Sequence, residues 1–273
     1  MTTWRTDRMR SRWLAPCLVA LLVSGLAGCA HQAARDPGAT ATDSAAGEAD
    51  ARRRARIRLE LAASYLQAGQ KSVALEEVNQ ALATDPAYAD AYHLRGLVYM
   101  AMPDLGLAED SLRRAQAMKP ADPDIMHNLG WLLCQRQQYD QAQQQFERAL
   151  AAPTYAARSK TLMSQGLCHQ KAGRVADAEK ALLRAYEIDA GNPMVGYHLA
   201  SILLARGETQ RAQFYIRRVN NGQFANAESL WLGVKVERAV GDTVAMRQLG
   251  DQLRKRFPDA RETHAFERGA FDE

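Results

Sequence analysis

Cysteine and histidine are the residue types in this chain that could supply a nucleophile, a base or a metal ligand. Cys168 and His169 are adjacent, and neighbouring residues on a helix point about 100° apart, so they do not form a nucleophile–base pair. His93 and His127 stand 34 residues apart, and two such surface histidines are more often solvated or in contact with a partner than bound to metal. The sequence has no glycine-rich phosphate loop, no His-Glu-x-x-His and no Cys-x-x-Cys. We therefore expect no catalytic residues, no metal site, no cofactor and no small-molecule substrate.

The first 28 residues have the features of a secretory signal. Four arginines and one aspartate precede an apolar run, Trp13 to Leu26, which is shorter than the roughly 20 residues of a membrane-spanning helix. The run ends in Leu-Ala-Gly-Cys at residues 26–29, which resembles a bacterial lipobox. We expect a lipoprotein signal peptide at residues 1–28 and acylation of Cys29; the alternative is a secreted protein without a lipid.

The residue after Cys29 bears on the membrane that would receive the protein. Bacterial lipoproteins with aspartate in that place tend to stay at the inner membrane, and here it is Ala30. Three acyl chains bind a bilayer far more firmly than one. We therefore expect a lipid-anchored protein on the periplasmic face of the outer membrane.

Charge excludes a further class of partner. The chain has 35 basic and 31 acidic residues, and without residues 1–28 it has 31 and 30. No basic patch remains, so we expect no nucleic-acid partner.

Residues 29–53 follow as a segment without large apolar side chains. The stretch is rich in Ala, Thr, Ser, Gly and acidic residues. Such a composition buries too little apolar surface to offset the entropy of ordering, so we expect a flexible tether after the lipidated Cys29.

A repeat of about 34 residues begins at Arg54. Three series of small residues recur at this spacing: Ala62, Gly96, Gly130, Gly166, Ala200 and Gly233; then Ala74, Ala108, Ala142, Ala178, Ala212 and Ala245; then Ala81, Ala115, Ala149, Ala185 and Val219. The first series is expected where one helix crosses its partner, and the second on that partner at the contact. This period is the signature of the tetratricopeptide repeat, a helix–turn–helix unit.

Glycine and proline mark the ends of the helices. Gly69, Gly173 and Gly207 stand at the turn within their units. Several units end at a proline, namely Pro86, Pro120, Pro153 and Pro258. We predict an all-α protein, a tetratricopeptide-repeat solenoid of about six repeats at residues 54–260 that forms a right-handed superhelix. Residues 261–273 are expected to form a C-terminal capping segment.

The first helix of each unit lines the concave side of such a solenoid. Side chains there that miss the core would face a groove suited to a partner helix or an extended peptide. In the first three units these are Leu59, Ala63, Leu66, His93, Leu97, Met100, His127, Asn128 and Trp131. Trp131 is the expected anchor, since large aromatics dominate interfaces; the alternative is that several of these side chains pack between repeats.

Cys134 and Cys168 occupy neighbouring places on the first helices of the third and fourth units. These helices are expected to pack side by side, and an oxidising compartment permits a disulfide between them. We favour the bond over two buried free thiols.

Several stretches resemble one known family. Residues 128–134 (Asn-Leu-Gly-Trp-Leu-Leu-Cys), residues 153–155 (Pro-Thr-Tyr), residues 212–216 and residues 230–233, with the lipobox and six repeats, are similar to type IV pilus biogenesis lipoproteins of the PilF/PilW kind. The resemblance implies a pilotin: an outer-membrane lipoprotein that binds the pilus secretin subunit and helps it reach the membrane and multimerise. It also implies that the early repeats make this contact, through the face of Leu59, His93, Leu97, His127 and Trp131.

Two other functions compete with this one. The first is a tetratricopeptide lipoprotein adaptor for cell-wall enzymes or another envelope assembly machine. The second is a periplasmic thiol hydrolase that uses Cys134 or Cys168, which a disulfide between them would exclude.

Overall fold

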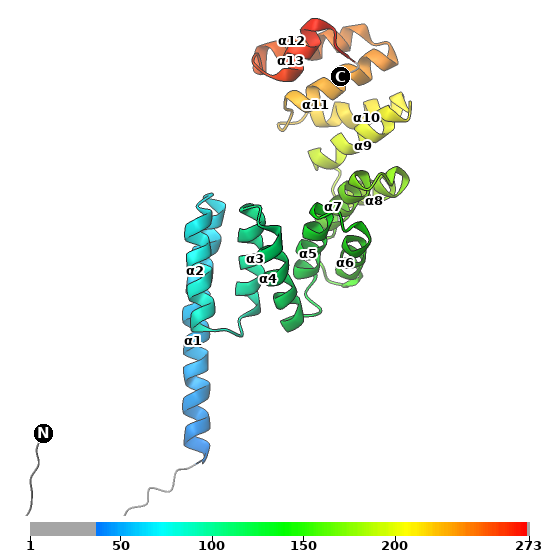
Figure 1. The fold of residues 1–273 in the computed structure, drawn as a ribbon. Helices are drawn as coiled ribbons and strands as arrows, with labels where there is room; N and C mark the ends of the chain where they lie inside the picture. The colour runs from blue at the N-terminus through cyan, green and yellow to red at the C-terminus, as the bar shows by residue number, and fades with distance from the viewer. Residues whose placement is uncertain (1–36, 272–273) are drawn as a thin grey trace, which may run out of the picture. The chain divides into compact units, whose positions relative to one another are not determined.

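The computed structural model describes residues 37–271, with side chains from residue 46 onward, and every regular element in this range is an α-helix (Figure 1). The signal peptide and Cys29 lie outside the described residues. The helices are α1 (Pro37–Gln67), α2 (Lys71–Thr84), α3 (Ala89–Ala101), α4 (Leu105–Met118), α5 (Pro123–Gln135), α6 (Tyr139–Ala151), α7 (Arg158–Lys171), α8 (Val175–Ile188), α9 (Pro193–Ala205), α10 (Thr209–Asn220), α11 (Ala227–Val240), α12 (Thr243–Arg256) and α13 (Arg261–Arg268).

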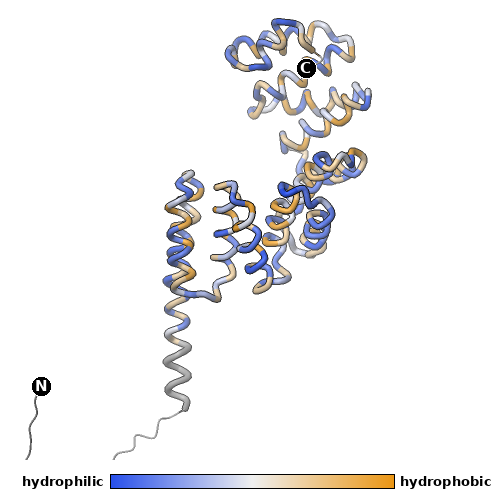
Figure 2. Tube along the Cα trace, in the orientation of Figure 1, coloured by the Kyte–Doolittle hydropathy of each residue, from blue (hydrophilic) through white to orange (hydrophobic). Residues whose placement is uncertain are grey.

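Consecutive helices pack in pairs. The most extensive contacts join α3 to α4, α5 to α6, α7 to α8, α9 to α10 and α11 to α12, and Ala62 of α1 shares a buried cluster with Val78 of α2. The second helix of each pair also contacts the first helix of the next. Apolar and polar residues alternate along the helices (Figure 2), as expected when each helix buries only some of its faces. Within the described residues, the prediction of an all-α array of helix–turn–helix repeats is confirmed.

The small residues of the 34-residue period lie where the helices of a pair cross. All six members of the first series are buried, as are the second series up to Ala212 and the whole third series. A Cβ atom added to Gly96, Gly130 or Gly166 would lie 3.3 Å from the carbonyl oxygen of Ala108, Ala142 or Ala178, respectively. The first and second series of small residues therefore meet where the two helices of a pair cross. The two backbones are so close there that a larger side chain does not fit between them.

The turns within the pairs need a left-handed backbone. Gly69, Gly173 and Gly207 have φ between 72° and 77°, a region that glycine enters without steric cost. In the third pair Gln137 takes this place, with φ 61°. Between the pairs, Asp122 and Asn192 cap α5 and α9, each with a proline in the first turn.

The structure differs from the predicted tether over residues 37–53, because α1 begins at Pro37. This part is rich in alanine, the best helix former, and Asp50 forms ion pairs with Arg53 and Arg54 one turn away. Packing against the repeats begins near Arg52, which pairs with Asp85 and lies 4.7 Å from the ring centroid of Tyr88. The low apolar content of residues 37–53 predicted that this segment makes few core contacts. It gave no indication that the first helix of the repeats extends back through the segment.

At the other end, α13 contacts both α11 and α12. Phe266 covers Gly250 so closely that a Cβ there would come within 2.0 Å of its ring. The ring of Phe271 stacks on Trp231, with 5.7 Å between centroids. Among the helices of residues 37–271, none has the length and apolar character needed to cross a membrane.

Replacing Gly130 tests the crossing. Gly130→Val is expected to lower the free energy of unfolding by about 1–3 kcal/mol, since the new side chain meets Phe146 within 2.9 Å. Urea unfolding followed by circular dichroism measures this. Gly106→Ala in the first turn of α4, with its nearest contact at 3.7 Å, is the control and is expected to be neutral or slightly stabilising. Equal stability of Gly130→Val and wild type would contradict the close crossing.

Candidate functional site

A hollow between α1 and α3 brings together four of the residues predicted for the groove. Its volume is about 420 Å³, within the range of roughly 300–1,000 Å³ that is typical of ligand pockets. The lining residues are Arg56, Leu59, Glu60, Ala63, Tyr88, Asp90, His93, Leu94 and Leu97. The floor is apolar, and Arg56, Glu60 and Asp90 place charges of both signs around it.

The wall of this hollow combines leucines with one polar link. Leu59 and Leu97 are half-buried, and Leu97 belongs to none of the core clusters of the described residues. Nδ2 of Asn128 on α5 donates to Nε2 of His93 on α3 across 2.7 Å. Burial lowers the pKa of His93, against the opposing effect of Asp122, Asp124 and Asp90. His93 is therefore neutral at pH 7, where Nε2 can accept this hydrogen bond.

His127 does not face the groove. Its side chain is 3% exposed, and Nδ1 lies 2.9 Å from the hydroxyl of Thr161 on α7. That hydroxyl lies 3.0 Å from the hydroxyl of Tyr155. One arrangement of protons satisfies all three groups: Tyr155 donates to Thr161, which donates to Nδ1 of His127. The 34-residue spacing predicted that His127 occupies the same place on its helix as His93 does. The packing of α7 against α5 buries His127.

Thr161 is not among the predicted site residues, and Tyr155 entered only as the last residue of the Pro-Thr-Tyr stretch at 153–155, where the step from Gly130 to Gly166 is two residues longer than 34. Tyr155 belongs to the loop between α6 and α7, and its side chain is 7% exposed and packs with Met126 and Ala149. The aromatic residue within the two-residue lengthening of the repeat was the signal that could have indicated a buried role.

The remaining predicted groove residues lie further along the first helices. Met100 and Trp131 pack against the core cluster that contains Leu129 and Phe146, and Leu66 is half-buried. The ammonium of Lys171 lies 5.4 Å from the centroid of the Trp131 ring. Trp131 is thus partly a packing residue.

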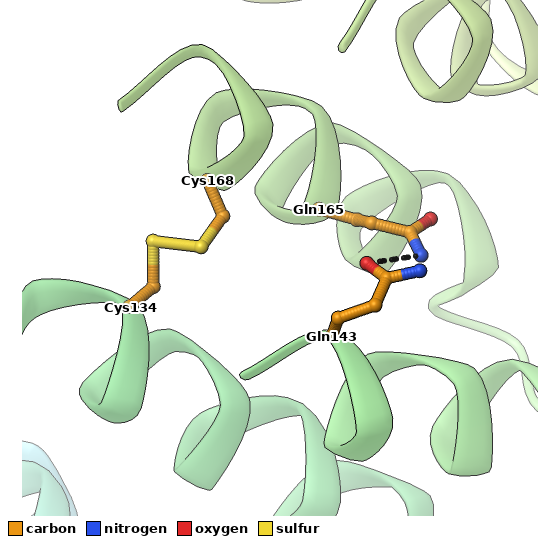
Figure 3. The surroundings of a disulfide bond; sticks show 4 residues. All are labelled: Cys134, Gln143, Gln165 and Cys168. Carbon is orange, nitrogen blue, oxygen red and sulfur yellow. Dashed lines mark hydrogen bonds between the residues drawn. A yellow bond between two sulfur atoms is a disulfide. The ribbon is translucent and has the colours of Figure 1, made fainter. Parts of the chain in front are cut away.

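Cys134 of α5 and Cys168 of α7 form a disulfide, with 5.8 Å between their Cα atoms (Figure 3). Both side chains are at most 4% exposed. On the neighbouring face, Nε2 of Gln165 donates to Oε1 of Gln143 on α6 across 3.0 Å. These two links tie the third helix pair to the fourth. With both thiols in the bond, neither is free to act as a nucleophile beside His169.

No group of three His, Cys, Asp or Glu side chains within the described part of the chain is arranged to hold a metal ion. The hollow between α1 and α3 has an apolar floor, with charges of both signs at its rim.

The helix pairs and the hollow along their first helices define a tetratricopeptide-repeat protein. The profile of the tetratricopeptide repeat family matches residues 59–123 and 127–193. The chain is 28% identical over 250 residues to the type IV pilus assembly protein PilF of Pseudomonas aeruginosa, covering 92% of this chain and 96% of PilF.

Two solved structures have the same arrangement. That of PilW, described as a widely conserved type IV pilus biogenesis factor, superposes with a TM-score of 0.72 at 28% identity, covering 78% of this chain and 97% of PilW. That of P. aeruginosa PilF gives 0.72 at 26% identity, covering 82% and 99%. The chain belongs to the PilF/PilW family of tetratricopeptide-repeat proteins, and it is a scaffold, not an enzyme.

Reduction of the disulfide is expected to destabilise the chain. Loss of the cross-link between Cys134 and Cys168 should lower the free energy of unfolding by about 3–4 kcal/mol in the chain-entropy model. Urea unfolding with and without a phosphine reductant measures this. The double variant Cys134→Ala/Cys168→Ala is the control, and it should not respond to reductant. A peptide map of the unreduced protein that lacks the Cys134–Cys168 pair would contradict the bond.

Stability should also fall as the pH drops below 6.5. Burial, and then Lys160 and His93, lower the pKa of His127 to about 4, below its ordinary value of 6.5. The unfolded chain therefore binds a proton that the folded chain does not, so this contribution is complete above pH 6.5 and is lost as the pH falls towards 4. It amounts to about 2–3 kcal/mol between pH 7 and 4.5.

His127→Gln removes this titration. Its urea midpoint should therefore decline less between pH 7 and 4.5 than that of wild type. The matched control is His264→Gln, at an exposed position on α13, which should keep the wild-type pH dependence. Identical pH profiles for His127→Gln and wild type would contradict the low pKa.

Proposed function

We propose that this protein is an outer-membrane lipoprotein scaffold, a pilotin, that binds the type IV pilus secretin subunit and promotes its outer-membrane localisation and multimerisation. Membership in the PilF/PilW family supports a role in type IV pilus assembly, since its relatives are described as a pilus assembly protein and a pilus biogenesis factor. Binding of the secretin subunit is proposed in addition to this role in pilus assembly.

The observation that carries the proposal is the hollow between α1 and α3. Leu59, Ala63 and Leu97 offer apolar surface that a partner helix could cover with residues one turn apart. The hydrogen bond between Asn128 and His93 holds the wall in place, so little ordering entropy is lost on binding. Arg56, Glu60 and Asp90 at the rim favour one register and orientation of the bound segment, because charges give specificity more than affinity.

The anchor is the second part of the proposal. Acyl chains on Cys29 would hold the protein on the periplasmic face of the outer membrane. The repeats would then present the hollow to a secretin subunit and retain it at the membrane until it joins the multimer. The chain itself changes no covalent bond in this scheme.

Leu97→Glu tests the hollow. A carboxylate in the apolar wall is expected to weaken binding of the purified secretin subunit at least about tenfold, measured by biolayer interferometry. Leu107→Glu is the control, because Leu107 lies on the second helix of the same repeat and is 45% exposed; it should bind as wild type does. Circular dichroism checks that both variants stay helical. Unchanged binding by Leu97→Glu would remove the site from the early repeats.

Cys29→Ala tests the anchor. Without a thiol to acylate, the protein is expected in the soluble periplasmic fraction, and the secretin should appear as monomers instead of heat-resistant multimers. Membrane fractionation and immunoblotting of the host measure both. A variant that leaves the outer membrane while surface pili form normally would refute delivery by the anchor, without bearing on the binding hollow.

A further inference from the structure

A small notch lies between α8, α9 and α10, on repeats that the proposed secretin site does not use. Its volume is 40 Å³. It is lined by Tyr186, the turn at residues 190–193, Gly196, Tyr215, Arg218, Val219, Gly222 and Phe224. Gly196 leaves this space open only because it lacks a side chain: a Cβ there would come within 2.7 Å of Val219.

Large apolar side chains remain exposed around the notch. Phe224, in its wall, is 61% exposed, and Phe214, on α10, is 60% exposed. Ile188, two residues from Tyr186 and from Ala190, is 55% exposed, and Met194, which follows Pro193, is 49% exposed. Proteins rarely leave apolar side chains gathered at the surface unless a partner covers them. The apolar surface at this notch is therefore unusual for a solvent-exposed turn.

Aromatic rings connect the surface to the notch. The ring of Phe214 meets that of Tyr215 edge-on, with 5.1 Å between centroids, and Tyr215 meets Tyr186 in the same way at 5.0 Å. Such edge-to-face contacts fix the rings in place. A side chain that entered the notch would find rigid walls and would lose little entropy in ordering them.

The hydroxyl of Tyr186 is buried and has no hydrogen-bond partner among the described residues. A buried donor without an acceptor destabilises the folded state. Tyr186 lines the notch, but its hydroxyl oxygen is buried, so the ring and not the hydroxyl is available to a ligand there.

Charge identifies the ligand further. Of the three arginines on α10, Arg211 pairs with Glu208 and Glu179, and Arg217 pairs with Glu237 and Asp242. Arg218 lines the notch and forms no ion pair within residues 37–271. The nearby Asp189 accepts from the backbone N–H of Gly191. The rim thus offers one unpaired guanidinium, which suits a carboxylate.

We propose that this notch is a second docking site, which takes a segment of a partner protein that carries a small apolar residue next to an acidic one. The small side chain, such as valine, enters the notch beside Gly196. The adjoining carboxylate pairs with Arg218. The site lies beyond the α1–α3 hollow, so a partner bound there leaves the hollow free.

Photocrosslinking with defined peptides tests the site. The full chain carries Phe214→p-benzoylphenylalanine, which puts the reactive group beside the notch. The probes are three peptides with Gly-Ser flanks and the cores Val-Asp, Val-Lys and Ser-Asp, and mass spectrometry measures the adducts. We expect the Val-Asp peptide to crosslink about three to five times more than either of the others, the range of a single exposed ion pair.

A charge reversal sharpens the result. Arg218→Glu should reverse the preference from Val-Asp to Val-Lys, while Arg247→Glu, at an exposed position on α12, should leave it unchanged. Phe224→Ser should lower the yield with all three peptides. Equal yields for the three cores, or a preference that survives Arg218→Glu, would overturn the proposal. Adducts between two copies of the chain without peptide adducts would assign the notch to self-association and also overturn it.

Discussion

The close approach of two helix backbones within each repeat is the constraint on which the rest of the structure depends. At Gly96, Gly130 and Gly166 the carbonyl oxygen of the partner helix would lie 3.3 Å from an added Cβ in all three repeats. This equal spacing gives these three repeats the same geometry at the crossing. Because each unit then contacts only its neighbours, the whole array inherits that geometry one step at a time.

Polar links between repeats add to this packing. Glu179 on α8 is 9% exposed and pairs with Arg206 and Arg211 of the next repeat. Glu237 on α11 is 1% exposed and pairs with Arg217 on the preceding α10. A buried carboxylate is tolerated only with such partners, so these pairs make register errors between repeats costly. The disulfide and the bond between Gln143 and Gln165 do the same between the third and fourth repeats.

Once the array is rigid, its two apolar surfaces can differ in character. The hollow between α1 and α3 has charges of both signs at its rim, whereas the notch beside α9 has Arg218, which forms no ion pair with any residue that the structure describes. A scaffold with separate sites can hold two segments at a fixed distance, which raises the effective concentration of one partner near the other. Such a role requires a stiff frame, which the small-residue crossings supply.

The sequence by itself determined the repeat, its phase and its turns, because the crossing at Gly130 and the left-handed turn at Gly173 exclude most residue types at fixed intervals. It also placed Cys134 beside Cys168, since both follow from the same period. Only the tertiary structure decided which side chains reach solvent. His93 and His127 occupy equivalent places in their repeats, yet His93 is half-buried whereas His127 is only 3% exposed. Thr161 on α7 bonds to His127, and Tyr155 from the loop before α7 bonds to Thr161. Burial depends on such neighbours from other repeats, which a local period does not encode.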